Sequence, residues 1–411
     1  MQLASPLGCM LRACALLGVI ALGLSTLPVR ARAQLGVEAA STVFHESGGP
    51  VSMTVVVPEV NANVDIADAL SVRASWSADV ISGASVAVVD APTETVDAIT
   101  TASVTDTRHV FGGGFTLRDE QSALAIGYRY GFENDYRSHG FDVSARTELF
   151  DRNSMFEIAY ARSFDSVCDG PGTEDPAQKP RLDSSDDCFD DSNPDRTDHD
   201  IDVHGLQLSA TQNLTPLLVM QLGLSAQIQH GFLSNPYRAV RIGPTAAQEH
   251  HPDNRARYAA TLGFRYWLEP LSGALQPSIR LYRDTWHLRA LSAELGYEQS
   301  LGTDLRIRVR GRFHVQTGAA FYSDDYVLAP RGQYFTGDRD LSPLKTVMGG
   351  AEVTYSVPAN AEGDVLGIFS TFKLSLKGDL LQTYLDDFHY DRVEPPNDLA
   401  LIGTFAILAE L

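Results

Sequence analysis

The chain lacks long apolar runs beyond its N-terminal segment. After residue 34 no stretch of eighteen consecutive apolar residues occurs, whereas a helix needs about 20 such residues to cross a bilayer. A helical membrane protein is therefore excluded. A membrane-spanning β-barrel is not, because its strands carry apolar residues only at alternate positions.

Basic residues are also in the minority. The 411 residues include 32 Lys and Arg against 52 Asp and Glu, which gives a net charge of −20. A nucleic-acid partner needs a basic footprint on the protein surface, so the composition argues against nucleic-acid binding. Net charge describes solubility and partners rather than the fold.

Cysteine is scarce, with four residues in the chain, and Cys9 and Cys14 lie close to the N-terminus. The remaining two, Cys168 and Cys188, make an even count, which predicts a disulfide if the chain is exported. This disulfide would close a loop of about 20 residues and contribute on the order of 3 kcal/mol in the chain-entropy model. Two free thiols are the alternative.

The N-terminus has the features of a secretory signal peptide. Arg12 supplies a positive charge, residues 13–27 form an apolar core, and residues 31–33 (Ala-Arg-Ala) make a small-x-small cleavage site. We therefore predict an exported protein from which residues 1–33 are removed. Their removal takes away three arginines and no acid, which leaves 29 basic and 52 acidic residues and a net charge of −23.

The stretch 304–316, Asp-Leu-Arg-Ile-Arg-Val-Arg-Gly-Arg-Phe-His-Val-Gln, alternates with a period of two. Arg306, Arg308, Arg310 and Arg312 occupy even positions, and the odd positions between them are apolar except for one glycine. This period is typical of a strand, whose successive side chains point to opposite faces. In a soluble sheet the arginines would face bulk water. In a transmembrane barrel they would line a wet lumen while the apolar face meets lipid.

Alternating segments recur along the whole chain, with almost no helical pattern. They predict sixteen strands, and bacterial single-chain barrels have an even number. The predicted strands lie at about 34–46, 52–66, 69–82, 106–118, 122–136, 138–150, 154–166, 201–213, 217–232, 255–269, 274–286, 287–300, 304–321, 344–357, 365–382 and 399–411.

The connections between these strands alternate in length. Short ones rich in turn residues lie at 66–69, 118–121, 151–153, 214–216, 270–273 and 301–304. The other set includes long ones at 83–105, 167–200, 233–254, 322–343 and 383–398. Outer-membrane barrels have this layout, with short turns in the periplasm and long loops outside. We therefore predict an all-β fold, an antiparallel up-and-down transmembrane barrel over residues 34–411.

The C-terminal segment supports the same fold. Phe405, Ile407, Ala409 and Leu411 form an apolar face that runs to the last residue. This face resembles the signal by which barrel-assembly machinery recognises its clients, with leucine in place of the usual terminal aromatic residue. The barrel-assembly machinery is thus an expected partner during biogenesis.

Three segments carry a family resemblance. Residues 76–84 have the pattern aromatic-x-x-Asp-x-x-Ser-Gly-Ala, and residues 127–138 (Gly-Tyr-Arg-Tyr-Gly-Phe-Glu-Asn-Asp-Tyr-Arg-Ser) and 151–153 (Asp-Arg-Asn) follow at similar spacing. These segments resemble an uncharacterised family of bacterial outer-membrane barrels, domain of unknown function 3570. The resemblance runs through most of residues 34–411. It implies a barrel of unknown biochemical role and brings no catalytic or binding residues with it.

The arginines of 304–316 have predicted neighbours of the same charge. Inward-facing positions on the two strands predicted at 255–269 and 274–286 carry Arg255, Arg257, Arg265 and Arg280. Guanidinium groups hold fixed donors for carboxylate and phosphate, so this basic wall suits the passage of anions. Glu294, Glu298 and Glu352 also face inward, and the alternative is a structural network of arginine–carboxylate pairs.

The connection 167–200 is strongly acidic. Its carboxylates include Asp186, Asp187, Asp190, Asp191 and Asp195, and hard oxygen ligands of this kind suit calcium. The spacing and the glycine of an EF-hand loop are absent. A solvated extracellular loop and a lid that folds inward onto the basic wall are the alternatives, and calcium is the one cofactor that the sequence suggests.

No catalytic constellation is found in the sequence. His314 is predicted to face the lumen, but no Ser or Cys is arranged with it as a nucleophile. Gly112, Gly113 and Gly114 lie within a predicted strand and indicate close packing rather than a phosphate loop. We therefore expect no enzyme.

Together these features predict a passive pore or channel in the outer membrane of a Gram-negative-type bacterium. Lipid would surround the barrel, and the arginine-lined lumen would favour small anionic solutes. The alternative function is a non-conducting structural or binding barrel whose acidic loop holds a partner or calcium.

Overall fold

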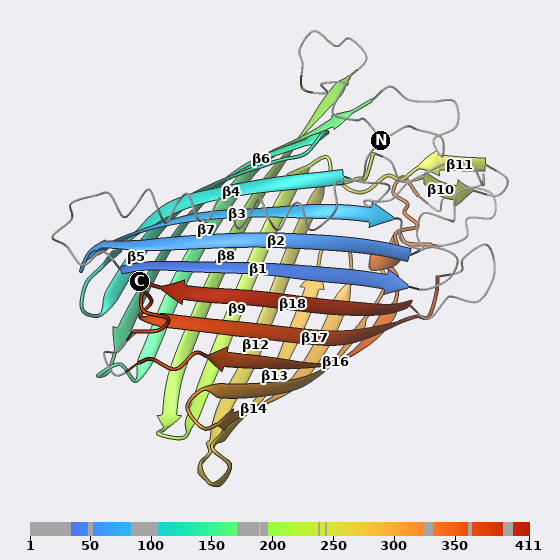
Figure 1. The fold of residues 1–411 in the computed structure, drawn as a ribbon. Coiled ribbons are helices and arrows are strands. Elements are labelled where there is room, and N and C mark those ends of the chain that lie inside the picture. The colour runs from blue at the N-terminus through green and yellow to red at the C-terminus, as the bar shows by residue number, and fades with distance from the viewer. Residues whose placement is uncertain are drawn as a thin grey trace, which may run out of the picture.

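The computed structural model describes residues 34–47, 52–83, 106–170, 189, 196–236, 239–242, 245–323, 332–360, 364–388 and 398–411. Most of these residues lie in long strands (Figure 1). In the described part of the chain, helices are limited to short turns, and none is long and apolar enough to cross a membrane.

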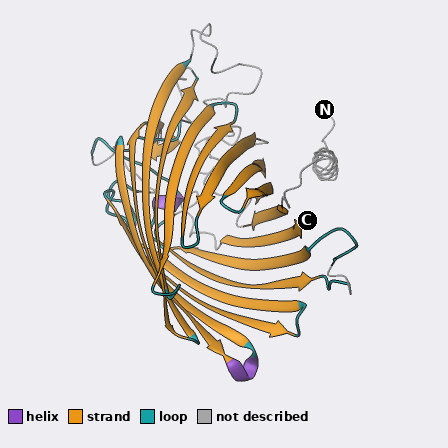
Figure 2. Ribbon diagram, turned by 90° about the vertical axis from the view of Figure 1, so that its left-hand side faces the viewer, coloured by secondary structure: helices purple, strands orange, loops and turns teal. Residues whose placement is uncertain are grey.

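Sixteen antiparallel strands form one closed barrel, which confirms the predicted fold class. Consecutive strands are neighbours, and β1 pairs with β18 to close the wall (Figure 1). Figure 2 shows the strands side by side as one curved wall. The barrel strands are β1 (Gln34–Ser47), β2 (Ser52–Ala67), β3 (Leu70–Gly83), β4 (Asp106–Arg118), β5 (Ser122–Phe132), β6 (Tyr136–Leu149), β7 (Ser154–Asp169), β8 (Thr197–Thr215), β9 (Leu218–Gly231), β12 (Asn254–Leu268), β13 (Gly273–Asp284), β14 (Arg289–Leu301), β15 (Leu305–Gln316), β16 (Leu344–Ser356), β17 (Thr371–Leu385) and β18 (Asp398–Glu410).

The period-two pattern decides which side chains face outward. On β15, Val309 and Phe313 are 46% and 45% exposed although both are apolar. Leu222 and Leu224 of β9 repeat this pattern about a quarter of the way round the barrel. A continuous apolar face around a closed barrel is the surface that lipid requires. The fold is therefore that of an outer-membrane barrel.

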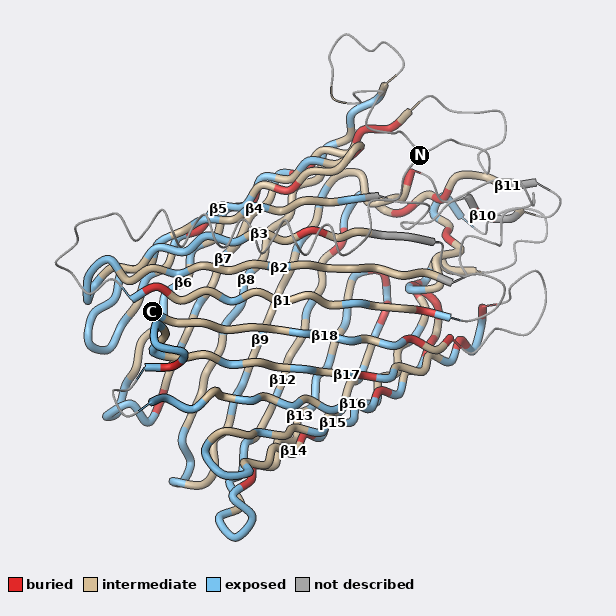
Figure 3. The backbone as a smooth tube through the Cα atoms, in the orientation of Figure 1, coloured by how far each residue is buried: buried red, intermediate tan, exposed pale blue. Residues whose placement is uncertain are grey.

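Buried residues gather mainly where the long connections lie (Figure 3). One apolar cluster there contains Trp286, Leu288, Ala319 and Leu341, and a second contains Leu344, Leu385 and Phe388. Both clusters join connections to strand ends. The tightest packing of the barrel thus lies at one mouth rather than along the middle of the lumen.

The short connections turn sharply at the opposite end. Between β6 and β7, residues 150–152 all adopt positive φ values of 55°, 53° and 66°. Between β14 and β15, Gly302 has a φ of +70°, a conformation that glycine adopts without steric strain. The predicted segregation of short turns at one end and long connections at the other is confirmed.

Several predicted boundaries were wrong. β17 begins at Thr371 rather than 365, because Val365 and Phe369 pair across a separate turn in which Leu366 has a φ of +55°. β15 ends at Gln316 rather than 321, since the chain there leaves the barrel wall. β7 and β8 continue into the predicted loop 167–200 and pair Cys168 with Asp198. The connection after β9 also contains a small unpredicted sheet, β10 (Ala239–Ile242) and β11 (Thr245–Gln248).

Candidate functional site

The arginines of β15 face the lumen, since Val309 between them lies exposed on the outer face. In the register, Arg312 lies opposite Glu294 on β14, and Arg308 lies opposite Glu352 on β16. If each arginine formed an ion pair with its register partner on the next strand, these residues would be the pairs. The ion pairs that form in the lumen are different ones.

Arg310 reaches across a whole strand to form its pair. It donates from Nε to Asp379 Oδ1 at 2.9 Å and from Nη2 to Oδ2 at 2.7 Å, in a forked arrangement. Gly350 of β16 lies between them, opposite both in register. A Cβ on Gly350 would fall 1.9 Å from Asp379 Oδ1. The pair therefore requires glycine at this position and ties β15, β16 and β17 together.

Glu298 lies within ion-pair distance of two further arginines. Its Oε1 lies 3.1 Å from Arg265 Nη2 and 3.6 Å from Arg306 Nε. Both arginine side chains are more than half exposed, so water in the lumen screens these attractions. The two guanidinium groups remain accessible despite their shared partner.

Arg280, Arg308 and Arg312 form no ion pair with any residue in the described ranges. The Nε of Arg308 is buried without a hydrogen-bond partner. Glu352, which lies opposite Arg308, instead accepts a hydrogen bond from Ser375 Oγ at 2.9 Å. Three inward guanidinium groups are thus left to interact with solutes.

Arg255, by contrast, is neutralised near the outer end of β12. Its Nε and Nη2 donate to Asp284 Oδ2 at 2.9 and 2.6 Å, and the Asp284 side chain is fully buried. The guanidinium carbon also lies 4.0 Å from the ring centre of Trp286. Arg257, two residues along, donates within the described ranges to Gln227 alone, at 3.3 Å. Neighbouring arginines on one strand therefore have different roles.

The connection between β15 and β16 reaches residues of the lumen face on β1 and β18. Within it, Arg339 of the short helix η4 (Arg339–Leu341) pairs with Glu46 of β1 at 2.7 Å and with Asp398 of β18 at 2.8 Å. Burial alone would lower the pKa of Arg339, but nearby carboxylates, Asp340 included, outweigh burial and raise it above its usual value. The arginine therefore stays charged. Its two ion pairs hold this connection against β1 and β18, past the ends of the intervening strands β16 and β17.

The same connection is anchored on a second side. Leu341 and Ala319 pack with Trp286 in the buried cluster at the mouth. Thr336 donates its hydroxyl to Glu249 Oε2 at 2.8 Å, from the connection after β9. We call residues 317–323 and 332–343 the inward connection. Its contacts with both sides of the barrel place it across part of the outer mouth.

The wall opposite β15 contains a second long-range bridge. Arg73 Nη2 of β3 donates to Asp142 Oδ2 of β6 at 2.9 Å, across β4 and β5. A Cβ on Gly114 would lie 2.9 Å from Arg73 Nε, and one on Gly127 would lie 2.6 Å from its Nη2. The side chain of Arg73 therefore needs glycine at position 114, the last residue of the glycine run 112–114. The run provides close packing, as the sequence predicted.

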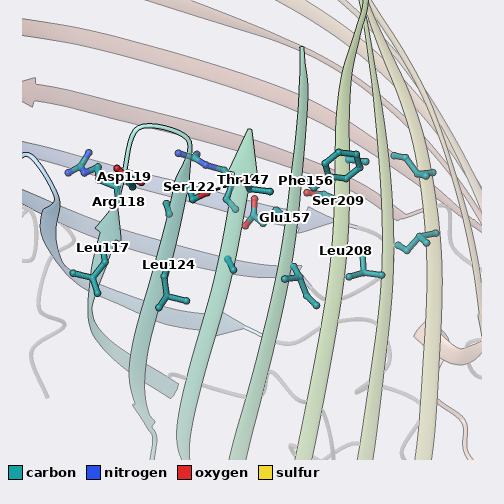
Figure 4. Close-up of a pocket in the computed structure, with 17 residues that line it drawn as sticks. Leu117, Arg118, Asp119, Ser122, Leu124, Thr147, Phe156, Glu157, Leu208 and Ser209 are labelled. Carbon is teal, nitrogen blue, oxygen red and sulfur yellow. Dashed lines mark hydrogen bonds between the residues drawn. The ribbon is translucent and has the colours of Figure 1, made fainter. Parts of the chain in front are cut away.

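A hollow of about 760 Å³ lies outside the lumen, over β4 to β9. Figure 4 shows Leu117, Leu124, Phe156 and Leu208 among its lining. These side chains have the outward parity of the apolar face, and each is at least 38% exposed. The hollow therefore meets acyl chains of the bilayer and does not contribute to a path for solutes.

Several predicted groups lie outside the described residues. The disulfide stays a prediction, because Cys168 is buried at the end of β7 while Cys188 is outside those ranges. The calcium hypothesis also stays a prediction, since its five aspartates are outside them: Asp186, Asp187, Asp190, Asp191 and Asp195. Within the described ranges, no three His, Cys, Asp or Glu residues form a metal-binding group. The predicted signal peptide, 1–33, likewise lies outside the described residues.

Sequence reasoning missed the principal partners of the arginines that the strand parity places on the lumen face. Asp379 and Asp284 were not identified, although their strand parity is inward. A signal for Asp379 was present, since Gly350 on the intervening strand leaves room for a long side chain to pass. Arg339 gave no comparable signal because its segment has no periodic pattern.

A closed barrel with an apolar outer belt and a charged lumen defines a porin-like outer-membrane protein. The family described as a protein of unknown function, DUF3570, matches residues 8–379. The chain belongs to this family. No curated protein matches it.

Solved outer-membrane proteins are similar in fold. The siderophore receptor PirA from Acinetobacter baumannii matches at 9% identity and a TM-score of 0.46, over 86% of this chain and 53% of the receptor. A bacterial polysaccharide outer membrane secretin matches at 9% identity and a TM-score of 0.47, over 92% and 98% of the two chains. OccK11 (OpdR) from Pseudomonas aeruginosa matches at 8% and 0.42, over 92% and 96%. The chain thus spans about half the length of the receptor, and at these identities the likeness concerns the fold alone.

Proposed function

We propose that the protein is a passive outer-membrane channel whose lumen favours anionic solutes. The observation that supports this most directly is that three inward arginines on β13 and β15, namely Arg280, Arg308 and Arg312, form no ion pair with the described residues. Accessible cations along a pore attract anions and repel cations. In this proposal the segment 1–33 directs export, and barrel-assembly machinery inserts the barrel into the outer membrane.

The paired arginines have a supporting role in this proposal. Arg310 and Arg255 hold strands together through buried carboxylates, so their positive charge is largely cancelled. Selectivity then depends on the unpaired arginines and, to a smaller degree, on Arg265 and Arg306. This division separates structural from functional positions within one ladder.

Planar-bilayer conductance of the refolded protein, under a salt gradient, tests the proposal. Wild type should conduct steadily, with a reversal potential that reports anion preference. The double variant Arg308→Gln with Arg312→Gln should lower the anion-to-cation permeability ratio several-fold and should leave heat-modifiable folding intact. The matched control is Arg283→Gln, because Arg283 faces outward beside Tyr258 and its loss should not change selectivity.

Absence of conductance from a correctly folded barrel would refute the channel. The alternative is a non-conducting binding barrel, which the anchored inward connection favours because it occupies part of the mouth. In that case the acidic connection after β7 would hold a partner or calcium. Calorimetric titration of the folded protein with calcium chloride would then show saturable binding.

A further inference from the structure

A polar cavity of about 520 Å³ lies at the extracellular end of the lumen. Its lining comes from distant parts of the barrel, including Arg108 of β4, Tyr136 of β6, Gln229 of β9 and Arg257 of β12. His251, from the connection after β9, closes one side. Because the inward connection and both walls contribute to it, a solute that enters the lumen from outside meets this cavity before the ladder on β15.

Four buried polar atoms in this cavity have no hydrogen-bond partner among the residues that the structure describes. They are Arg108 Nε, Gln229 Oε1, His251 Nε2 and Arg257 Nε. Buried polar groups in folded proteins are almost always paired, so four such atoms around one cavity indicate a missing partner. A polar ligand would provide it.

Two of these atoms call for an acceptor on the ligand. The guanidinium groups of Arg108 and Arg257 present N–H donors and form no ion pair in the described part of the chain. Arg108 is held in place by stacking, with its guanidinium carbon 4.7 Å from the ring centre of Tyr136. A carboxylate is the ligand group that best matches two guanidinium donors.

The other two atoms suit hydroxyl groups. Gln229 Oε1 is an acceptor. Nδ1 of His251 lies 2.9 Å from the carbonyl oxygen of Leu233 and donates to it, so Nε2 accepts a hydrogen bond when the ring carries one proton and donates one when it carries two. Nε2 lies 3.4 Å from Glu249 Oε2, which also accepts from Thr336. A hydroxyl group can donate and accept, so hydroxyl groups on the ligand would suit Gln229 and either form of His251.

Further charges limit the ligand to one negative charge. The carboxylates of Asp79, Glu133, Asp135, Glu249 and Asp338 also line the cavity, and they would repel a polyanion. They accept hydrogen bonds readily, which again favours a ligand rich in hydroxyl groups. Trp286 adds an aromatic surface at the wall near His251, with the two ring centres 5.1 Å apart.

We propose that this cavity binds a small monocarboxylate that carries several hydroxyl groups. The inference deepens the proposed channel and rests on it for a role in transport, where the cavity would select the solute at the outer mouth. Binding itself does not require conduction. The two ideas can therefore be tested separately.

Tryptophan fluorescence of the folded barrel in detergent provides a binding assay, because Trp286 lines the cavity and the chain has only three tryptophans. Three six-carbon probes separate the requirements: gluconate has charge and hydroxyls, hexanoate has charge alone, and glucose has hydroxyls alone. Gluconate should change the fluorescence saturably and bind at least tenfold more tightly than the other two. Equal binding of hexanoate would overturn the hydroxyl requirement, and equal binding of glucose would overturn the carboxylate requirement.

Variants assign the contacts. Arg257→Gln should weaken gluconate at least tenfold, and Arg108→Gln provides the same test from the opposite wall if the first variant folds poorly. Gln229→Leu should lower gluconate affinity toward that of hexanoate, and the outward control Arg283→Gln should bind as wild type does. Gluconate binding by a barrel that does not conduct would refute only the channel. Conductance without saturable gluconate binding would refute only this cavity.

Discussion

The two walls of the barrel contain the same kind of bridge in different surroundings. On one wall Arg310 passes over Gly350 to Asp379, and the side chains are 22% and 1% exposed. On the other wall Arg73 passes over glycines to Asp142, with side chains 48% and 27% exposed. An ion pair in water contributes little to stability, whereas removal of one partner from a buried pair is strongly destabilising. Identical local chemistry therefore has a structural role on one wall and a minor one on the other.

The walls also differ in net charge. Strand parity places basic residues in the majority on β12 to β17, where inward positions carry Arg255, Arg257, Arg265, Arg280, Arg306, Arg308, Arg310, Arg312, Lys373 and Lys377 against Asp284, Glu294, Glu298, Glu352 and Asp379. On β1 to β7 acids are in the majority: Glu38, Glu46, Glu59, Asp65, Asp79, Asp142, Glu148, Glu157 and Asp165 against Arg73, Arg108, Arg118, Arg129 and Arg146. The lumen of this acidic protein is thus polarised from side to side.

The largest expected effect follows from Gly350→Leu. The new side chain would displace Asp379 and leave a buried carboxylate without Arg310, which should destabilise the barrel by roughly 2–3 kcal/mol. Urea unfolding in lipid vesicles measures the change. Gly349→Leu is the matched control. Gly349 is adjacent to Gly350 but faces lipid, and a Cβ on it meets nothing within 4 Å. Equal destabilisation by both variants would show that the bridge is not the cause.

Arg339→Ala should have an intermediate effect at the mouth. It leaves the buried carboxylates of Glu46 and Asp398 without their cation, at a local cost of about 1–2 kcal/mol. The inward connection should then detach from β1 and β18, which limited proteolysis of the folded barrel would detect as new cleavage within residues 317–323 and 332–343. Arg152→Ala, which removes an exposed pair with Glu148 at the far end, should leave this region protected. Unchanged protection in Arg339→Ala would mean that Trp286 and its neighbours hold the connection alone.

Gly127→Ala should have a smaller effect than either. Its Cβ would meet the ends of Arg73 and Asp142 at 2.5–2.8 Å, and these flexible, exposed groups can move aside. Loss of such a screened pair should cost less than about 1 kcal/mol. The same urea titration serves here, and a loss as large as that for Gly350→Leu would contradict the contrast between the two walls.

Glu157→Gln should have the smallest effect, and on selectivity rather than stability. Its side chain faces the lumen from β7 without an ion pair in the described ranges. Removal of one accessible acid should raise anion preference slightly, in the opposite direction to the double variant Arg308→Gln with Arg312→Gln. Reversal potentials of the two proteins under one salt gradient test this sign. An unchanged reversal potential would place Glu157 outside the conducting path, and a shift toward cations would contradict the predicted sign.

The sequence predicted the wall of the barrel better than its contents. Alternation assigns each strand residue to lipid or lumen, so the faces of Arg308 and Val309 follow from order alone. The partner of Arg310 does not, because it depends on the side chain of the strand between, and only Gly350 permits the crossing. The cavity with Arg108 and Arg257 could not be predicted, because the inward connection that helps to form it has no periodic pattern in its sequence.

The seam between β1 and β18 has a consequence for how the barrel is made. Gly36 lies opposite Glu410, and the amide of Leu411 donates to the carbonyl oxygen of Leu35 at 2.9 Å. Contacts of such sequence separation form slowly, because the chain between them must be ordered first. Until β18 arrives, β1 and β17 each present an unpaired edge that could recruit another chain. A helper that shields these two edges would protect the nascent barrel at the stage when it is most prone to aggregate.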